Sequence, residues 1–146
     1  MLVPILKIDQ DLTEVKKLIH AERADDTWPL ALAILQDEKY EKIQFKKIFN
    51  QYGDNIYYSD PDRANLYLGG GATPKPEQSI AYLLRNEVLT NIEALRAELE
   101  YLLKTGEDDT EDLYAYANNA ADGMKKYLSI VPPTELEAAR RTLQSK

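Results

Sequence analysis

Apolar residues recur every three or four positions along most of the chain, which is the spacing of an amphipathic helix. The longest uninterrupted stretch covers residues 77–103, and another covers residues 113–128. Gly106 lies just beyond the first stretch, where glycine is a favoured helix terminus. Asp108 and Glu111 form a capping box ahead of the second. The pattern therefore predicts two long helices in the second half of the chain.

The first half of the chain shows the same period with weaker boundaries. Asp11 stands at the head of a possible capping box, so we expect the first helix to begin there. Thr27 is the expected cap of the next helix, because Pro29 would then lie in the first turn, where proline is tolerated. The polar run 36–39 interrupts the apolar period. Residues 27–58 are accordingly predicted to form one helix that is kinked in the middle.

Helix breakers separate these helices from two further segments. Glycine and proline are concentrated in residues 59–75, which predicts one long loop, and the pair Pro132-Pro133 precedes a short final helix. The predicted fold class is all-α: an up-and-down four-helix bundle over residues 1–130, with a short, mobile C-terminal helical segment at 131–146. The residues expected to share its core are Trp28, Leu32, Phe49, Leu84, Leu95, Leu99 and Met124.

Composition narrows the classes of function. The chain has 18 Lys and Arg against 25 Asp and Glu, and the resulting net charge of −7 would repel a phosphate backbone, so no nucleic-acid partner is expected. No stretch approaches the roughly 20 apolar residues of a membrane-spanning helix. Cysteine is absent, which excludes disulfides and thiolate metal sites.

The chemistry-bearing residues are too few for a known catalytic or metal-binding pattern. His20 is the only histidine, so neither a zinc site nor a di-iron carboxylate site has enough ligands. Asp60 and Asp62 resemble the start of a calcium loop, but the acceptor spacing fails at Ala64. The glycine loop at 67–75 lacks the Gly-Lys-Ser/Thr ending of a phosphate loop. We predict no cofactor and no enzymatic activity; an enzyme would need convergent carboxylates with shifted pKa values.

Two clusters are candidates for contact with a partner protein. Lys39, Lys42, Lys46 and Lys47 concentrate positive charge in an acidic chain, which favours docking on carboxylates, although an ordinary solvated helix face would look the same. The chain has 10 Tyr against 2 Phe and 1 Trp, and three tyrosines flank the long loop as either a contact surface or a core edge. The candidate contact residues of this region are Tyr57, Tyr58, Asp60, Asp62, Arg63 and Tyr67.

Five short motifs stand out in the sequence: TWPL at 27–30, FKKIFN at 45–50, NIYYSDPDRAN at 55–65, YLLRNE at 82–87 and YLS at 127–129. Together they resemble the PsbQ-like extrinsic subunits of photosystem II of the diatom and algal type. They are distinctive but not catalytic, and they span most of the chain. The resemblance does not extend to the long proline-rich N-terminal arm of the plant subunits, so plant-type anchoring contacts are not expected.

The resemblance implies a fold, a location and a role. It implies a four-helix domain, the lumen of the chloroplast thylakoid as its location, and a mature chain from which a targeting peptide has been removed. It also implies contacts with photosystem II core subunits and other extrinsic subunits, through which the protein is peripheral to the membrane and supports the oxygen-evolving complex and its calcium and chloride retention. We expect the free protein to be a monomer.

A non-photosynthetic helical adaptor that binds another protein partner is the main alternative. A capped bundle with a tyrosine-lined loop would show the same composition and the same helical period. These features therefore do not choose between the two functions.

Overall fold

The computed structural model describes residues 2–20, 24–57, 76–107 and 109–144. Within those ranges the regular elements are all helical, and no described helix is long and apolar enough to cross a membrane. The elements are α1 (Val3–Ile19), α2 (Ala24–Leu35), the 3-10 helix η1 (Glu38–Tyr40), α3 (Lys42–Tyr57), α5 (Pro76–Thr105), α6 (Glu111–Ser129) and α7 (Pro133–Gln144).

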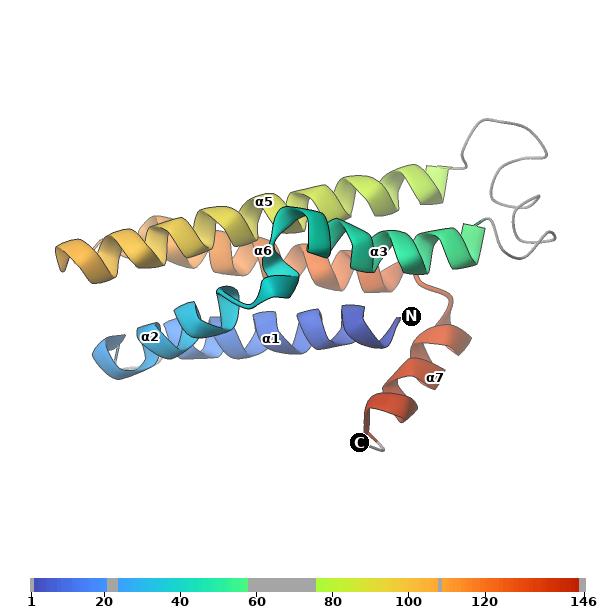
Figure 1. Ribbon diagram of the computed structural model, residues 1–146, viewed down its shortest axis with the longest axis horizontal. Coiled ribbons are helices and arrows are strands. Elements are labelled where there is room, and N and C mark those ends of the chain that lie inside the picture. Colours follow the sequence, from blue (N-terminus) through green and yellow to red (C-terminus); the bar gives the residue numbers. More distant parts are fainter. Residues whose placement is uncertain (1, 21–23, 58–75, 108, 145–146) are drawn as a thin grey trace.

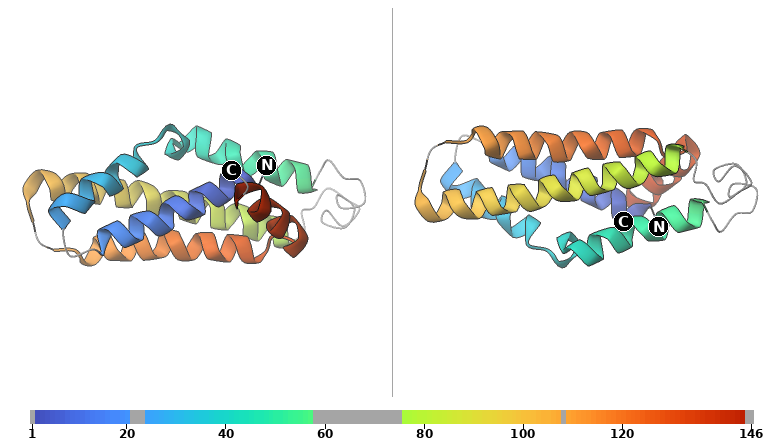
Figure 2. Two further views of the ribbon diagram at one scale, coloured as in Figure 1. Left: turned by 90° about the horizontal axis from the view of Figure 1, so that it is seen from below. Right: turned by 90° about the horizontal axis from the view of Figure 1, so that it is seen from above.

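The helices alternate in direction along one common axis (Figure 1). α1 runs one way, α2 and α3 together return, and α5 and α6 then form the longest antiparallel pair. α7 leaves the end of α6 at an angle and packs beside the beginning of α1, as the two views of Figure 2 also show. The predicted fold class, an all-α up-and-down bundle followed by a short C-terminal helix, is confirmed.

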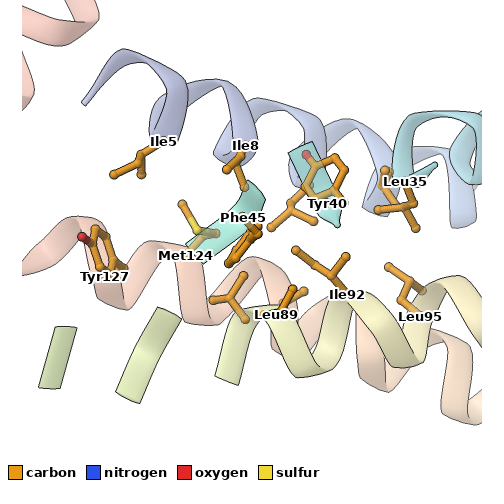
Figure 3. Close-up of a cluster of buried hydrophobic side chains, with 14 of the residues drawn as sticks. Ile5, Ile8, Leu35, Tyr40, Phe45, Leu89, Ile92, Leu95, Met124 and Tyr127 are labelled. Carbon is orange, nitrogen blue, oxygen red and sulfur yellow. The ribbon is translucent and has the colours of Figure 1, made fainter. Parts of the chain in front are cut away.

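One continuous core lies between the helices (Figure 3). Ile8 of α1, Phe45 of α3, Ile92 of α5 and Met124 of α6 are fully buried and point toward one another. Of the predicted core residues, Leu32 and Leu84 are only partly buried and pack at its margin. The others, Trp28, Phe49, Leu95, Leu99 and Met124, are buried as expected.

Two predicted helix starts are wrong. α1 begins at Val3, and Asp11 lies in its middle, because Pro4 is tolerated in the first turn and buried Ile5 extends the apolar stripe toward the N-terminus. α2 likewise begins three residues before Thr27. Pro29 therefore lies inside α2, where its missing N–H removes one backbone hydrogen bond.

The predicted kink is a complete break in the helix. α2 ends at Leu35, and the Asp37 carboxylate accepts a hydrogen bond from the backbone N–H of Lys39 at 3.0 Å, which caps η1. Glu41 is extended, and α3 starts immediately after it. The polar run thus lets the chain change direction between two helices that face different parts of the core.

The boundary between α5 and α6 follows the sequence more closely. Gly106 has a φ of 73°, the left-handed conformation in which glycine terminates a helix without strain. Asp109 accepts a hydrogen bond from the backbone N–H of Glu111 at 3.1 Å near the start of α6. Asp108, the predicted capping residue, lies outside the described residues.

Candidate functional site

Lys39 is separated from the other predicted docking lysines by an internal contact. Its ammonium group lies 2.7 Å from the Asp11 carboxylate of α1 and 5.6 Å from the centre of the Tyr40 ring. Both side chains of the ion pair are partly buried. The sequence grouped Lys39 with the lysines of α3, but its charge is already neutralised within the fold.

The same carboxylate holds Tyr40 in place. Tyr40 is fully buried, and its hydroxyl donates a hydrogen bond of 2.8 Å to the Asp11 carboxylate. Burial raises the pKa of Tyr40 far above its ordinary value, and the hydrogen bond to Asp11 raises it further, so the phenol stays protonated and remains a donor. We call Asp11, Lys39 and Tyr40 the Asp11 latch; it ties η1 to α1 immediately before α3.

Lys42, Lys46 and Lys47 form the part of the patch that remains available, and we call them the lysine face of α3. Lys42 and Lys47 are exposed, and Lys46 is partly exposed. No ion pair joins any of the three to a residue that the structure describes. The sequence from Lys42 to Tyr52 contains no carboxylate. The face therefore carries a local positive charge on an acidic protein, as the sequence predicted.

The predicted tyrosine-lined loop falls almost wholly outside the described residues. Tyr57 is the last residue of α3, and the structure shows only its place in the helix. The contact role of this loop stays a prediction. The residues beyond the description are Tyr58, Asp60, Asp62, Arg63 and Tyr67.

Residues from separate sequence motifs meet where α3 packs on the bundle. The Asn50 side chain of FKKIFN accepts a hydrogen bond from the Arg85 guanidinium of YLLRNE. Arg85 also lies 5.1 Å from the centre of the Tyr82 ring, and burial lowers its pKa. Phe49 of FKKIFN meets Tyr127 of YLS edge-on at 4.8 Å between ring centres. These motif residues hold α3 against α5 and α6.

The motif TWPL contacts the C-terminal end of α1, away from the cluster around α3. Trp28 is buried, and its indole N–H donates a hydrogen bond of 3.2 Å to the backbone carbonyl of Ile19, the last residue of α1. The indole therefore satisfies a carbonyl at a helix end that would otherwise need another donor. Its distinctive character in the sequence reflects packing of α2 on α1.

Two cavities border α7, and each is lined by a single carboxylate. The first, of about 360 Å³, includes Tyr52 and Glu135, whose side chains share a hydrogen bond of 2.9 Å. The second, of about 320 Å³, includes Asp9 beside Arg140 and Lys125. Burial raises the pKa of Asp9, although the two cations oppose this shift. Neither cavity brings together the convergent carboxylates that general acid–base catalysis would need.

Neither a search for metal-ligand groups nor a comparison with known proteins assigns a function to the chain. Among the described residues, no group of three or more His, Cys, Asp or Glu side chains is arranged to hold a metal ion. No family model, curated protein or solved structure matches the chain. The functional argument therefore starts from the motifs, the fold and the lysine face.

Proposed function

We propose that this protein is an extrinsic subunit of photosystem II on the lumenal side of the thylakoid membrane. It binds the membrane-intrinsic core, and it stabilises the oxygen-evolving complex and its retention of calcium and chloride by covering it and not by ligating it. The observation that carries the proposal is the spatial convergence of the motifs: residues of FKKIFN, YLLRNE and YLS meet in one packed cluster. Three of the five motifs behind the resemblance thus act together on one element, α3.

That cluster gives the proposed docking surface a rigid base. Phe45 and Phe49 bury one side of α3, while the lysine face lies on the same helix and is open to solvent. A lysine side chain on a well-packed helix loses less freedom on binding than one on a frayed helix. Three lysines on an acidic chain also orient the molecule toward a carboxylate-rich surface during encounter.

Reconstitution of salt-washed photosystem II particles tests the proposal. The protein should sediment with the washed particles and restore oxygen evolution at low calcium and chloride. Reversal of two lysines, in the variant Lys42→Glu/Lys46→Glu, should slow association and flatten its dependence on salt, because the screened attraction is removed. The matched control is Lys7→Glu/Lys17→Glu on α1, which makes the same change in net charge at exposed positions and should behave like the unchanged protein.

Failure of the unchanged protein both to bind and to restore activity would reject the photosystem function. A helical adaptor with another acidic partner would give that result while keeping the same fold. Normal binding of the Lys42→Glu/Lys46→Glu variant, with an unchanged salt response, would leave the function in place and exclude the lysine face as its contact.

A further inference from the structure

Ile43 is an apolar side chain on the outer surface of α3, bordered by lysines. It is 72% exposed, more than any other large apolar residue that the structure describes. Lys46 and Lys47 follow it by three and four residues and so neighbour it on the helix surface, while Lys42 precedes it directly. The buried side of α3, with Phe45 and its neighbours, faces the core.

The other strongly exposed apolar residues lack this surrounding. Leu83 on α5 is 67% exposed and Leu30 on α2 is 58% exposed. Glu87 follows Leu83 by four residues, so the neighbouring charge there is negative. Exposed single apolar residues are common and need no explanation by themselves. Ile43 differs because both charged residues that follow it on the helix surface, Lys46 and Lys47, are positive.

The placement of Lys42 runs against the stability of α3. The N-terminus of a helix carries partial positive charge, which favours acidic residues and disfavours lysine in the first turns. α6 follows this rule with Glu111 and Asp112 in its first turn, whereas α3 has Lys42 there and no acidic residue. Helix stability therefore does not account for a lysine at position 42, whereas a binding role of the lysine face would account for it.

We propose that Ile43 is the apolar anchor of an interface whose charged rim is the lysine face. The occupant is an acidic protein surface with an apolar depression that receives the isoleucine side chain. The inference rests on the proposed function and makes it more specific, because it places that acidic surface on the lumenal side of photosystem II. Charge complementarity selects the partner, because three lysines that form no ion pair with any described residue attract carboxylates. A desolvated apolar centre within a charged rim is the arrangement in which one side chain dominates binding.

A lipid surface is the weaker occupant. Anionic lipid headgroups would also attract the lysines, but stable membrane attachment needs more apolar burial than a single isoleucine provides. The overall net charge of −7 also opposes approach to an extended anionic surface.

The test compares Ile43→Ser with the matched variant Leu83→Ser on salt-washed photosystem II particles, with association and dissociation followed separately. Isoleucine and serine have similar helix propensities, so the first variant should keep its helix content. Ile43→Ser should weaken binding by about tenfold or more, chiefly through faster dissociation. Leu83→Ser should bind as the unchanged protein does. Lys42→Glu should associate more slowly while its midpoint of thermal unfolding is unchanged or higher, since a carboxylate suits that helix position.

The outcomes separate the two proposals. Binding of the unchanged protein with no effect of Ile43→Ser overturns the anchor while the photosystem function stands, and equal losses in both serine variants do the same. Complete absence of binding by the unchanged protein rejects the photosystem function and the anchor with it. Binding to phosphatidylglycerol-containing vesicles that is lost in Ile43→Ser would replace the protein partner with a lipid surface and overturn the inference.

Discussion

The tight contact between α5 and α6 at Gly123 allows a prediction of how a substitution there changes stability. Gly123 is buried in α6, and a Cβ atom added to it would lie 2.7 Å from the Cγ2 atom of Val88 in α5. Carbon atoms in contact prefer a separation of about 3.5–4.0 Å. Val88 is fully buried and β-branched, so its methyl group has few alternative positions on a helix. The variant Gly123→Ala must therefore push the two helices apart or strain the valine.

Two opposing free energies set the size of the effect. Alanine in place of glycine inside a helix stabilises the folded state by about 0.8–1.0 kcal/mol. Overpacking a filled core destabilises it by about 1–3 kcal/mol. The net expectation is a loss of about 0–2 kcal/mol of unfolding free energy. Val88→Ala alone should lose roughly 2–3 kcal/mol, since it removes two buried methyl groups and leaves a cavity.

The double variant Gly123→Ala/Val88→Ala isolates the contact. Without the valine methyl the alanine no longer clashes, it keeps its helix preference, and it fills part of the cavity. The double variant should therefore be about 1–3 kcal/mol more stable than the sum of the single effects predicts. Urea unfolding followed by circular dichroism at the helix minimum measures all the free energies.

Gly106→Ala is the control for these measurements. It should also be destabilising, because its φ of 73° disfavours alanine, but Val88→Ala should not rescue it. Two results would refute the close packing of α5 on α6. One is additive effects of Gly123→Ala and Val88→Ala on the unfolding free energy, and the other is an increase in stability by Gly123→Ala alone as large as its helix propensity predicts.

Two further expectations concern the elements around the proposed docking surface. Asp11→Ala should cost about 1–3 kcal/mol of unfolding free energy, because it leaves the buried Tyr40 hydroxyl without its acceptor. Asp11→Asn keeps an acceptor and should cost less, so equal losses of the two variants in a denaturant titration would contradict the Asp11 latch. The backbone amide hydrogens of α7 should exchange with solvent faster than those of α6, because Ala139 is the only buried residue of α7. Equally slow exchange through Thr142 would show that α7 is firmly docked.

The sequence predicted best where local signals agree with the core. α5 and α6 have long apolar periods and a terminal glycine between them, so their existence and direction follow from periodicity and turn chemistry. It failed at the starts of α1 and α2, where capping residues lie inside longer helices. A capping pattern states where a helix is able to begin, whereas packing of upstream residues such as Ile5 decides where it does begin.

The proposed site shows the same division. The lysine cluster is visible in the sequence, but the helical period of residues 27–58 does not say which of the apolar residues Ile43, Phe45 and Phe49 face the core. The structure buries the two phenylalanines and leaves Ile43 outside. Residues 43 and 45 point to nearly opposite sides of a helix, so only the orientation of α3 against its neighbours decides which of them is buried.

The amino-acid sequence by itself determined an all-helical chain, its main breaks and a local concentration of positive charge, because these depend on neighbours within a few residues. Only the tertiary structure decided which charges and apolar groups remain available. Lys39 is paired with Asp11, which is 28 positions earlier in the chain, and Tyr52 reaches Glu135 across 83 positions. Such pairs form when helix packing brings distant segments together, and no short-range pattern specifies that approach.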